Sequence, residues 1–86
     1  MRHSTTPGFW RCYRALPADL RRLARKNYLL LRADPKHPGL HFKRVGPDTW
    51  SARVGIKHRA VAARRGELFV WFWIGPHDEY ERLING

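Results

Sequence analysis

The sequence predicts an α+β domain in which two N-terminal helices pack on one face of a twisted four-stranded antiparallel sheet, and a short helix ends the chain. Three observations predict this fold. Apolar residues recur with a helical period in the first third of the chain, they alternate with a period of two beyond residue 40, and residues 68–74 form an unbroken apolar run. Because 86 residues are too few for two hydrophobic cores, we expect a single domain over residues 1–86.

Two helices are expected before residue 34. The run Ser4-Thr5-Thr6 precedes Pro7, and these residue types suit the N-cap and the first position of a short helix that ends at Leu16-Pro17. A second, basic helix follows, with one apolar stripe at i, i+3, i+4, i+8 and i+11: Leu20, Leu23, Ala24, Tyr28 and Leu31. It ends at Asp34-Pro35, because a residue before proline is pushed out of the helical region. No strand is expected ahead of these helices.

Four strands are expected after a loop over residues 34–39, which holds two prolines and a glycine. In chain order they are residues 40–43, in which Leu40 and Phe42 alternate with polar residues, then Trp50–Val54, Arg59–Arg64 and Leu68–Ile74. The last strand is apolar on both faces, so we place it centrally in the sheet or under the helices. Residues 77–84 are expected to form the closing helix.

The charge of the chain indicates an anionic partner. Seventeen Lys and Arg against seven Asp and Glu leave a formal net charge of +10, which is a large self-repulsion for so small a protein. Nucleic acid is the first candidate, because neutralising phosphates releases counterions and supplies affinity without sequence readout. An anionic membrane or an acidic protein would satisfy the same charge, and a well-solvated surface is the simplest alternative.

Several classes of protein are excluded or disfavoured. Cys12 is the only cysteine, so neither a disulfide framework nor a multi-cysteine zinc site is available. The histidine spacing matches no metal motif, so we expect neither a metal site nor a cofactor. No apolar leader follows the first residues, and the longest apolar run is too short to span a bilayer. We therefore expect a cytoplasmic protein with no membrane contact.

An ordered set of motifs covers almost the whole chain. Its members are Leu16-Pro17, Asp34-Pro35, Pro38-Gly39-Leu40, Phe42-Lys43, residues 50–54, His58-Arg59-Ala60-Val61 and the aromatic run that leads into residues 71–80. Over roughly residues 7–84 this set resembles the RelE/ParE toxin superfamily, in particular a subgroup described as cytotoxin-like. The expected lack of a first strand departs from the usual pattern of that superfamily.

The resemblance implies the toxin of a type II toxin–antitoxin pair, neutralised by an acidic antitoxin that wraps the helices and sheet. In the RelE-like branch such a toxin is a metal-independent mRNA endoribonuclease that inhibits translation, on the ribosome in some members. The ParE-like branch instead poisons DNA gyrase. A non-catalytic RNA-binding module is a further alternative.

RNA is cut without metal when its own 2′-hydroxyl attacks the adjacent phosphate, which requires cations for the phosphate and groups that move two protons. The resemblance assigns phosphate clamping to Arg53 and Arg59, and Lys43 matches a basic residue of the preceding strand. Lys57 is counted with these phosphate-binding residues. Strand alternation turns Arg53 away from the face that carries the helices. The alternative is that these side chains are solvated strand residues.

His77 follows the aromatic strand, where ribonuclease members of the superfamily carry a catalytic His or Tyr. An imidazole that titrates near neutrality suits protonation of the leaving 5′-oxygen, so His77 is the candidate general acid. Glu79 is the nearest candidate base, and Tyr80 is a second auxiliary candidate. Each has a structural alternative: a residue beside a helix cap for His77, a first-turn carboxylate for Glu79, and core packing for Tyr80.

Overall fold

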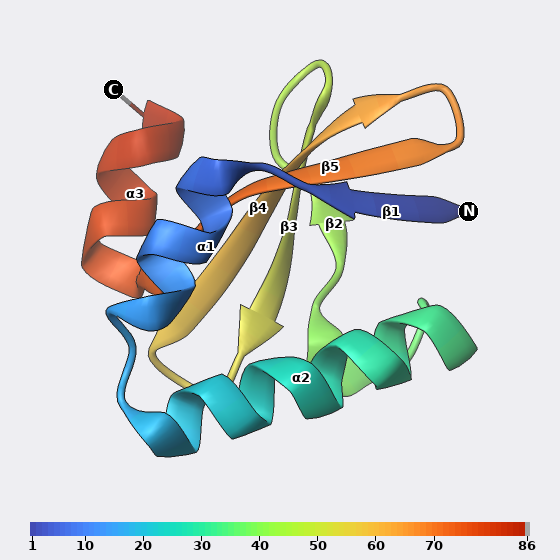
Figure 1. The fold of residues 1–86 in the computed structure, drawn as a ribbon. Coiled ribbons are helices and arrows are strands. Elements are labelled where there is room, and N and C mark those ends of the chain that lie inside the picture. Colours follow the sequence, from blue (N-terminus) through green and yellow to red (C-terminus); the bar gives the residue numbers. More distant parts are fainter. Residues whose placement is uncertain (86) are drawn as a thin grey trace.

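The computed structural model describes residues 1–85. Its elements, in chain order, are β1 (Arg2–Thr5), α1 (Pro7–Arg14), α2 (Ala18–Ala33), the 3-10 helix η1 (Pro38–Leu40), β2 (Lys43–Arg44), β3 (Thr49–Val54), β4 (His58–Arg65), β5 (Leu68–Pro76) and α3 (His77–Asn85). The strands form one sheet in the order β1-β5-β4-β3-β2 (Figure 1). β1 is parallel to β5, and the other neighbours are antiparallel, so the sheet is mixed.

The prediction of a four-stranded antiparallel sheet with no strand ahead of the helices is wrong, because β1 adds a fifth, parallel strand. Its sequence is polar and short, and its burial shows no alternation that a pattern could reveal. Backbone pairing holds it: the amide of Arg2 donates to the carbonyl of Glu67 (2.8 Å), and the amide of Thr6 donates to that of Trp71 (3.1 Å). β1 thereby covers the edge that β5 would otherwise expose.

The strand expected at residues 40–43 is also largely absent. Leu40 ends η1, and only Lys43 and Arg44 pair with β3. The imidazole Nδ1 of His37 accepts a hydrogen bond from the amide of Gly39, which favours the tight turn over an extended chain. His41 follows with a φ of 44°, a left-handed conformation that no strand accommodates.

Both N-terminal helices begin and end close to where the sequence predicts. The Oγ1 of Thr6 accepts from the amide of Phe9 (3.1 Å) and caps α1, and Pro7 occupies its first turn. α1 contacts β5, whereas α2 contacts β3, so the two helices lie over different strands of one face. Their apolar sides meet the sheet in a core of buried residues: Leu16, Leu31, Leu40, Ala52, Val54, Ala60, Ala62, Phe69, Trp71 and Ile74.

A β-bulge in β5 decides which of its residues enter this core. Ala62 of β4 pairs with Trp71, but the preceding Val61 pairs with Trp73, so Phe72 is an extra residue on β5. The bulge moves Ile74 onto the face of Trp71, where both are buried. Trp73 consequently faces the other side of the sheet.

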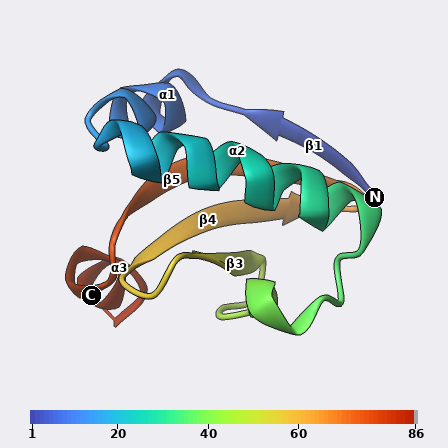
Figure 2. The ribbon, with the colours of Figure 1, turned by 90° about the horizontal axis from the view of Figure 1, so that it is seen from below.

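The third helix belongs to that other side. Figure 2 shows α1 and α2 on one side of the sheet and α3 on the opposite side. The hydroxyl of Tyr80 in α3 lies 3.1 Å from the Oγ of Ser51, which register pairing places on the face of Trp73. Between residues 1 and 85, no helix has the length and apolarity needed to cross a membrane.

Candidate nucleic-acid interface

The register of the central strands gathers the basic candidates on the face that carries α3. Arg53 of β3 pairs directly with Arg59 of β4, and Ser51 pairs with Lys43 of β2. Paired residues lie on the same face, and so do residues two apart on one strand. Lys43, Arg53 and Arg59 therefore share one surface, which we call the α3 face.

The side chain of Arg53 is held in a defined position. Its Nε donates to the carbonyl of Gly55 (3.1 Å), and its Nη1 lies 3.1 Å from the Nε2 of His41. A guanidinium only donates, so this second contact is a hydrogen bond when the Nε2 of His41 carries no proton.

Arg59 lies against α3. Its guanidinium carbon is 5.2 Å from the ring centroid of Tyr80, which is cation–π distance. Its Nε and Nη1 are buried and have no acceptor in the described part of the chain. A buried donor without an acceptor is costly to the fold, and a bound anion would supply the missing acceptor. Tyr80 itself is only 4% exposed and shares a hydrogen bond with the fully buried Ser51, as its core-packing alternative expected.

α3 begins beside the β3–β4 turn, which brings two further candidates to the end of the sheet that holds Arg53 and Arg59. The amide of His77 donates to the carbonyl of Lys57 (2.8 Å), while the side chain of Lys57 is exposed. The His77 ring is half-buried, 5.6 Å from the ring of Tyr80, and its Nε2 lies 3.6 Å from the Oε1 of Glu81. Glu79 is exposed on α3, with no hydrogen bond or ion pair among residues 1–85.

The cations of this protein are not neutralised internally. Over residues 1–85, no lysine or arginine lies within 4.0 Å of a carboxylate oxygen, and the one acid–base contact is His77 with Glu81. The chain has seventeen lysines and arginines, and their uncompensated positive charge gives the surface a positive electrostatic potential. Such a surface attracts anions.

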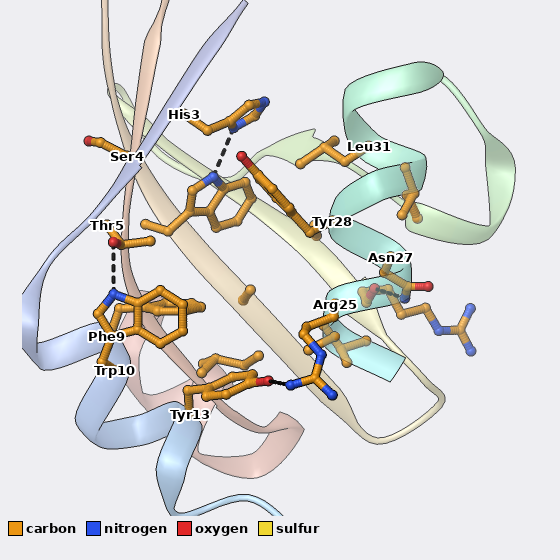
Figure 3. Close-up of a pocket in the computed structure, with 18 residues that line it drawn as sticks. His3, Ser4, Thr5, Phe9, Trp10, Tyr13, Arg25, Asn27, Tyr28 and Leu31 are labelled. Carbon is orange, nitrogen blue, oxygen red and sulfur yellow. Dashed lines mark hydrogen bonds between the residues drawn. The ribbon is translucent and has the colours of Figure 1, made fainter. Parts of the chain in front are cut away.

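A separate apolar groove of about 590 Å³ lies on the opposite side of the sheet, between β1, α1 and α2 (Figure 3). Aromatic side chains from α1, α2 and β5 surround it: Phe9, Trp10, Tyr13, Tyr28 and Trp71. Polar contacts fix its walls, because the Nε1 of Trp10 donates to the Oγ1 of Thr5 (2.9 Å) and Arg25 donates to the hydroxyl of Tyr13 (2.9 Å). Tyr28 and Leu29 are exposed on α2 at this side.

His3 joins β1 to the wall of this groove. Its Nδ1 accepts from the Nε1 of Trp71 (3.0 Å), and its ring lies 5.6 Å from that of Tyr28. Burial lowers the pKa of His3 below the usual value of 6.5, and the positive charges of Arg32 and the N-terminal amine lower it further. His3 is therefore a neutral structural residue at neutral pH.

Three contributors to these sites have no clear signal in the sequence. Ser51 supports Tyr80, His41 contacts Arg53, and His3 anchors β1. Strand alternation does place Ser51 on the face of Arg53. The contact of His41 depends on its left-handed backbone, which no pattern in the neighbouring residues reveals.

No protein-family model matches the chain, and no curated protein matches its sequence. Among solved structures, the RelB-RelE antitoxin-toxin complex from Methanococcus jannaschii matches with a TM-score of 0.73 at 11% identity, over 93% of this chain and 96% of that chain. The YoeB/ParE toxin from Agrobacterium tumefaciens gives a TM-score of 0.66 at 16% identity, covering 90% and 99%. The isolated E. coli RelE toxin gives 0.64 at 13% identity, covering 98% and 95%.

These matches span nearly the full length of both partners, and their sequence identities are so low that they report architecture. β1 is present in this chain, so its expected absence was an error of the sequence analysis. The chain has the fold of the RelE/ParE-superfamily toxins.

Proposed function

We propose that the protein is the toxin of a toxin–antitoxin pair and that it cleaves RNA without a metal, using the α3 face. One observation carries the proposal: Arg53 and Arg59 are register partners, no carboxylate neutralises them, and Arg59 keeps two buried nitrogens without an acceptor. Two guanidiniums on one surface suit the phosphodiester group, which accepts paired N–H donors. RNA meets such a protein in the cytoplasm.

The reaction requires proton transfers at two oxygens. The 2′-hydroxyl oxygen attacks phosphorus and loses its proton to a base, while the bond from phosphorus to the 5′-oxygen breaks and that oxygen gains a proton from an acid. The products are a 2′,3′-cyclic phosphate and a 5′-hydroxyl end. Arg53 and Arg59 stabilise the negative charge that builds up on the phosphate in the transition state.

Two side chains of α3 are the candidates for these transfers. Glu79 is the candidate base, because its carboxylate is exposed and has no hydrogen bond or ion pair among residues 1–85. His77 is the candidate acid, because its half-buried ring lies at the end of the sheet that holds Arg53 and Arg59. Lys43 and Lys57 are exposed and extend the positive surface along the RNA backbone.

We propose further that an acidic protein partner neutralises the toxin. The support is charge complementarity with a surface of net charge +10, together with the groove beneath α2, which the exposed Tyr28 lines. Co-expression with such a partner is expected to raise the soluble yield. A chain that purifies alone, is harmless to cells and has no affinity for acidic peptides would contradict this proposal.

The test of the activity is cleavage of a defined RNA by the purified chain, compared with the Arg53→Ala variant. We expect the variant to lose about 2.7–4 kcal/mol of barrier lowering, as for loss of one oxyanion donor, while its free energy of unfolding changes by less than about 1 kcal/mol. Arg22→Ala is the matched control, since Arg22 is exposed on α2. Parental cleavage by Arg53→Ala would remove Arg53 from the site.

A parallel measurement of DNA gyrase supercoiling separates the gyrase alternative from the ribonuclease. Inhibition of gyrase with no cut RNA would refute the ribonuclease proposal. Salt-dependent RNA binding in which the RNA length stays unchanged would instead indicate a non-catalytic binding module.

A further inference from the structure

Three arginines share a local arrangement at strand ends, each in an Arg-x-Gly sequence. In every case the Nε donates to the carbonyl oxygen of the glycine two residues later: Arg44 to Gly46 (3.0 Å), Arg53 to Gly55 (3.1 Å) and Arg64 to Gly66 (2.9 Å). The bond fixes the guanidinium relative to the backbone and leaves its two terminal amino groups for other partners. Within residues 1–85 the terminal amino groups of Arg44 and Arg64 have no hydrogen bond or ion pair.

Arg44 and Arg64 line the same pocket, of about 420 Å³, together with Pro47, Asp48, Trp50 and Gly66. The guanidinium carbon of Arg64 is 5.8 Å from the centroid of Trp50 and 5.7 Å from that of Phe69, so its plane rests over an aromatic surface. Arg44 pairs with Trp50 across the β2–β3 ladder and lies on the same face. Two positioned guanidiniums and an aromatic wall therefore meet at the end of the sheet away from α1.

This pocket is distinct from the site on the α3 face. Trp50 pairs with Ala62, which belongs to the core beneath α1 and α2, so the pocket opens on the helix-bearing side. Lys43 and Arg44 are consecutive on the edge strand β2 and project to opposite faces. Arg53 and Trp50 are three residues apart on β3, which is about 10 Å along the strand. A flexible polymer that passes around the sheet edge formed by β2 can therefore contact both the α3 face and this pocket.

We propose that Arg44 and Arg64 bind a second phosphodiester of the RNA strand, which passes from the α3 face around the β2 edge and past Lys43. The inference rests on the proposed function and adds a second contact to it. Trp50 distinguishes the ligand class: it lines the pocket beside the two arginines, and a nucleotide offers a base that can stack on an aromatic ring beside its phosphate.

The test measures binding of two RNAs to the full chain over a range of salt concentrations. The probes are a 2′-O-methyl dodecanucleotide, which has no 2′-hydroxyl to attack, and a 2′-O-methyl dinucleotide, which is too short to occupy both sites. The variant is Arg44→Gln/Arg64→Gln. The matched control is Arg22→Gln/Lys26→Gln, which removes two exposed cations from α2.

We expect the variant to bind the dodecanucleotide about tenfold more weakly, and its slope of log affinity against log salt to fall by about 0.7, because one phosphate contact is lost. Its affinity for the dinucleotide should equal that of the parent, and the control should keep the parental slope. A second variant, Arg44→Lys/Arg64→Lys, keeps both positive charges but loses the paired N–H donors of the guanidinium groups. It should keep the parental salt slope and bind the dodecanucleotide more weakly. It also serves if the glutamine variant does not fold.

Three outcomes would overturn the inference. If the glutamine variant behaves like its control, or the lysine variant binds as tightly as the parent, Arg44 and Arg64 do not form a phosphate site while the proposed function stands. If both substitutions weaken an acidic peptide and leave RNA binding unchanged, the pocket recognises protein. If the parent binds no RNA, the proposed function fails as well.

Discussion

Replacing Arg59 with methionine tests whether the partly buried guanidinium of Arg59 lowers the stability of the fold and is needed for the proposed activity. Methionine keeps an unbranched apolar stem in place of the aliphatic part of Arg59 and removes the guanidinium that lies over the Tyr80 ring. The substitution therefore separates the packing of Arg59 from its charge.

The magnitude follows from the contacts of Arg59. Its Nε and Nη1 are buried without an acceptor, and each such donor costs about 1–3 kcal/mol. The cation–π contact with Tyr80 returns only about 0.5–2 kcal/mol. At the middle of these ranges, we expect Arg59→Met to raise the free energy of unfolding by about 3 kcal/mol and the melting temperature by roughly 4–8 °C for each kcal/mol gained.

The assay is urea unfolding followed by tryptophan fluorescence, since the chain has four tryptophans. The same variant is assayed for RNA cleavage, where it is expected to be inactive. Stabilisation with loss of activity is the signature of a site residue. Destabilisation by more than about 1 kcal/mol would show that the guanidinium supports the fold, and the reasoning about its buried nitrogens would be refuted.

Three further changes test the remaining parts of the structure. Burial lowers the pKa of His3, so the unfolded chain binds a proton at this residue more readily than the folded chain; stability should be full above pH 6.5 and fall as the pH drops through the folded-state pKa. His3→Gln still offers an acceptor to Trp71, so it should flatten this pH dependence in unfolding experiments between pH 4 and 8. An unchanged slope would mean that another group causes the pH dependence. Thr6→Ala removes the cap of α1 and should cost about 1 kcal/mol in the same assay; no loss would mean that the cap contributes nothing. Ala24→Leu extends a side chain into the groove, so it should leave RNA cleavage intact and weaken the acidic partner in a titration, whereas undiminished partner binding would place the partner elsewhere.

The parts of the fold that were predicted correctly are those with strong local signals. α1 starts at a Thr-Pro cap, α2 follows an apolar stripe that ends at Asp34-Pro35, and β3 to α3 follow alternation and a Gly-Pro boundary. β1 was missed because a polar edge strand is held by backbone pairing with β5, which lies more than sixty residues away. The prediction of a strand at residues 40–43 was wrong, because the turn that His37 stabilises overrides the alternation of Leu40 and Phe42.

The candidate site likewise has features that the sequence predicts and features that it does not. Alternation predicted that Arg53 points away from the helices, and the register of β3 and β4 places Arg59 beside it as its partner. The roles assigned to them and to His77 stay predictions. What alternation does not reveal is where long side chains end: Arg53 reaches back to Gly55 and His41, and Arg59 lies across Tyr80. Such end points depend on loops and on α3, which are positioned by tertiary contacts.

The bulge at Phe72 explains how so apolar a strand leaves one side of the sheet for chemistry. Strict alternation through β5 would place Trp73 with Phe69 and Trp71 under the helices and turn Ile74 to the opposite face. The extra residue reverses the alternation, so Ile74 completes the core and Trp73 faces the α3 side, where its ring packs against Gly75. Gly75 is the register partner of Arg59. The bulge therefore puts an aromatic ring beside the register partner of Arg59, on a strand whose other face packs against the core.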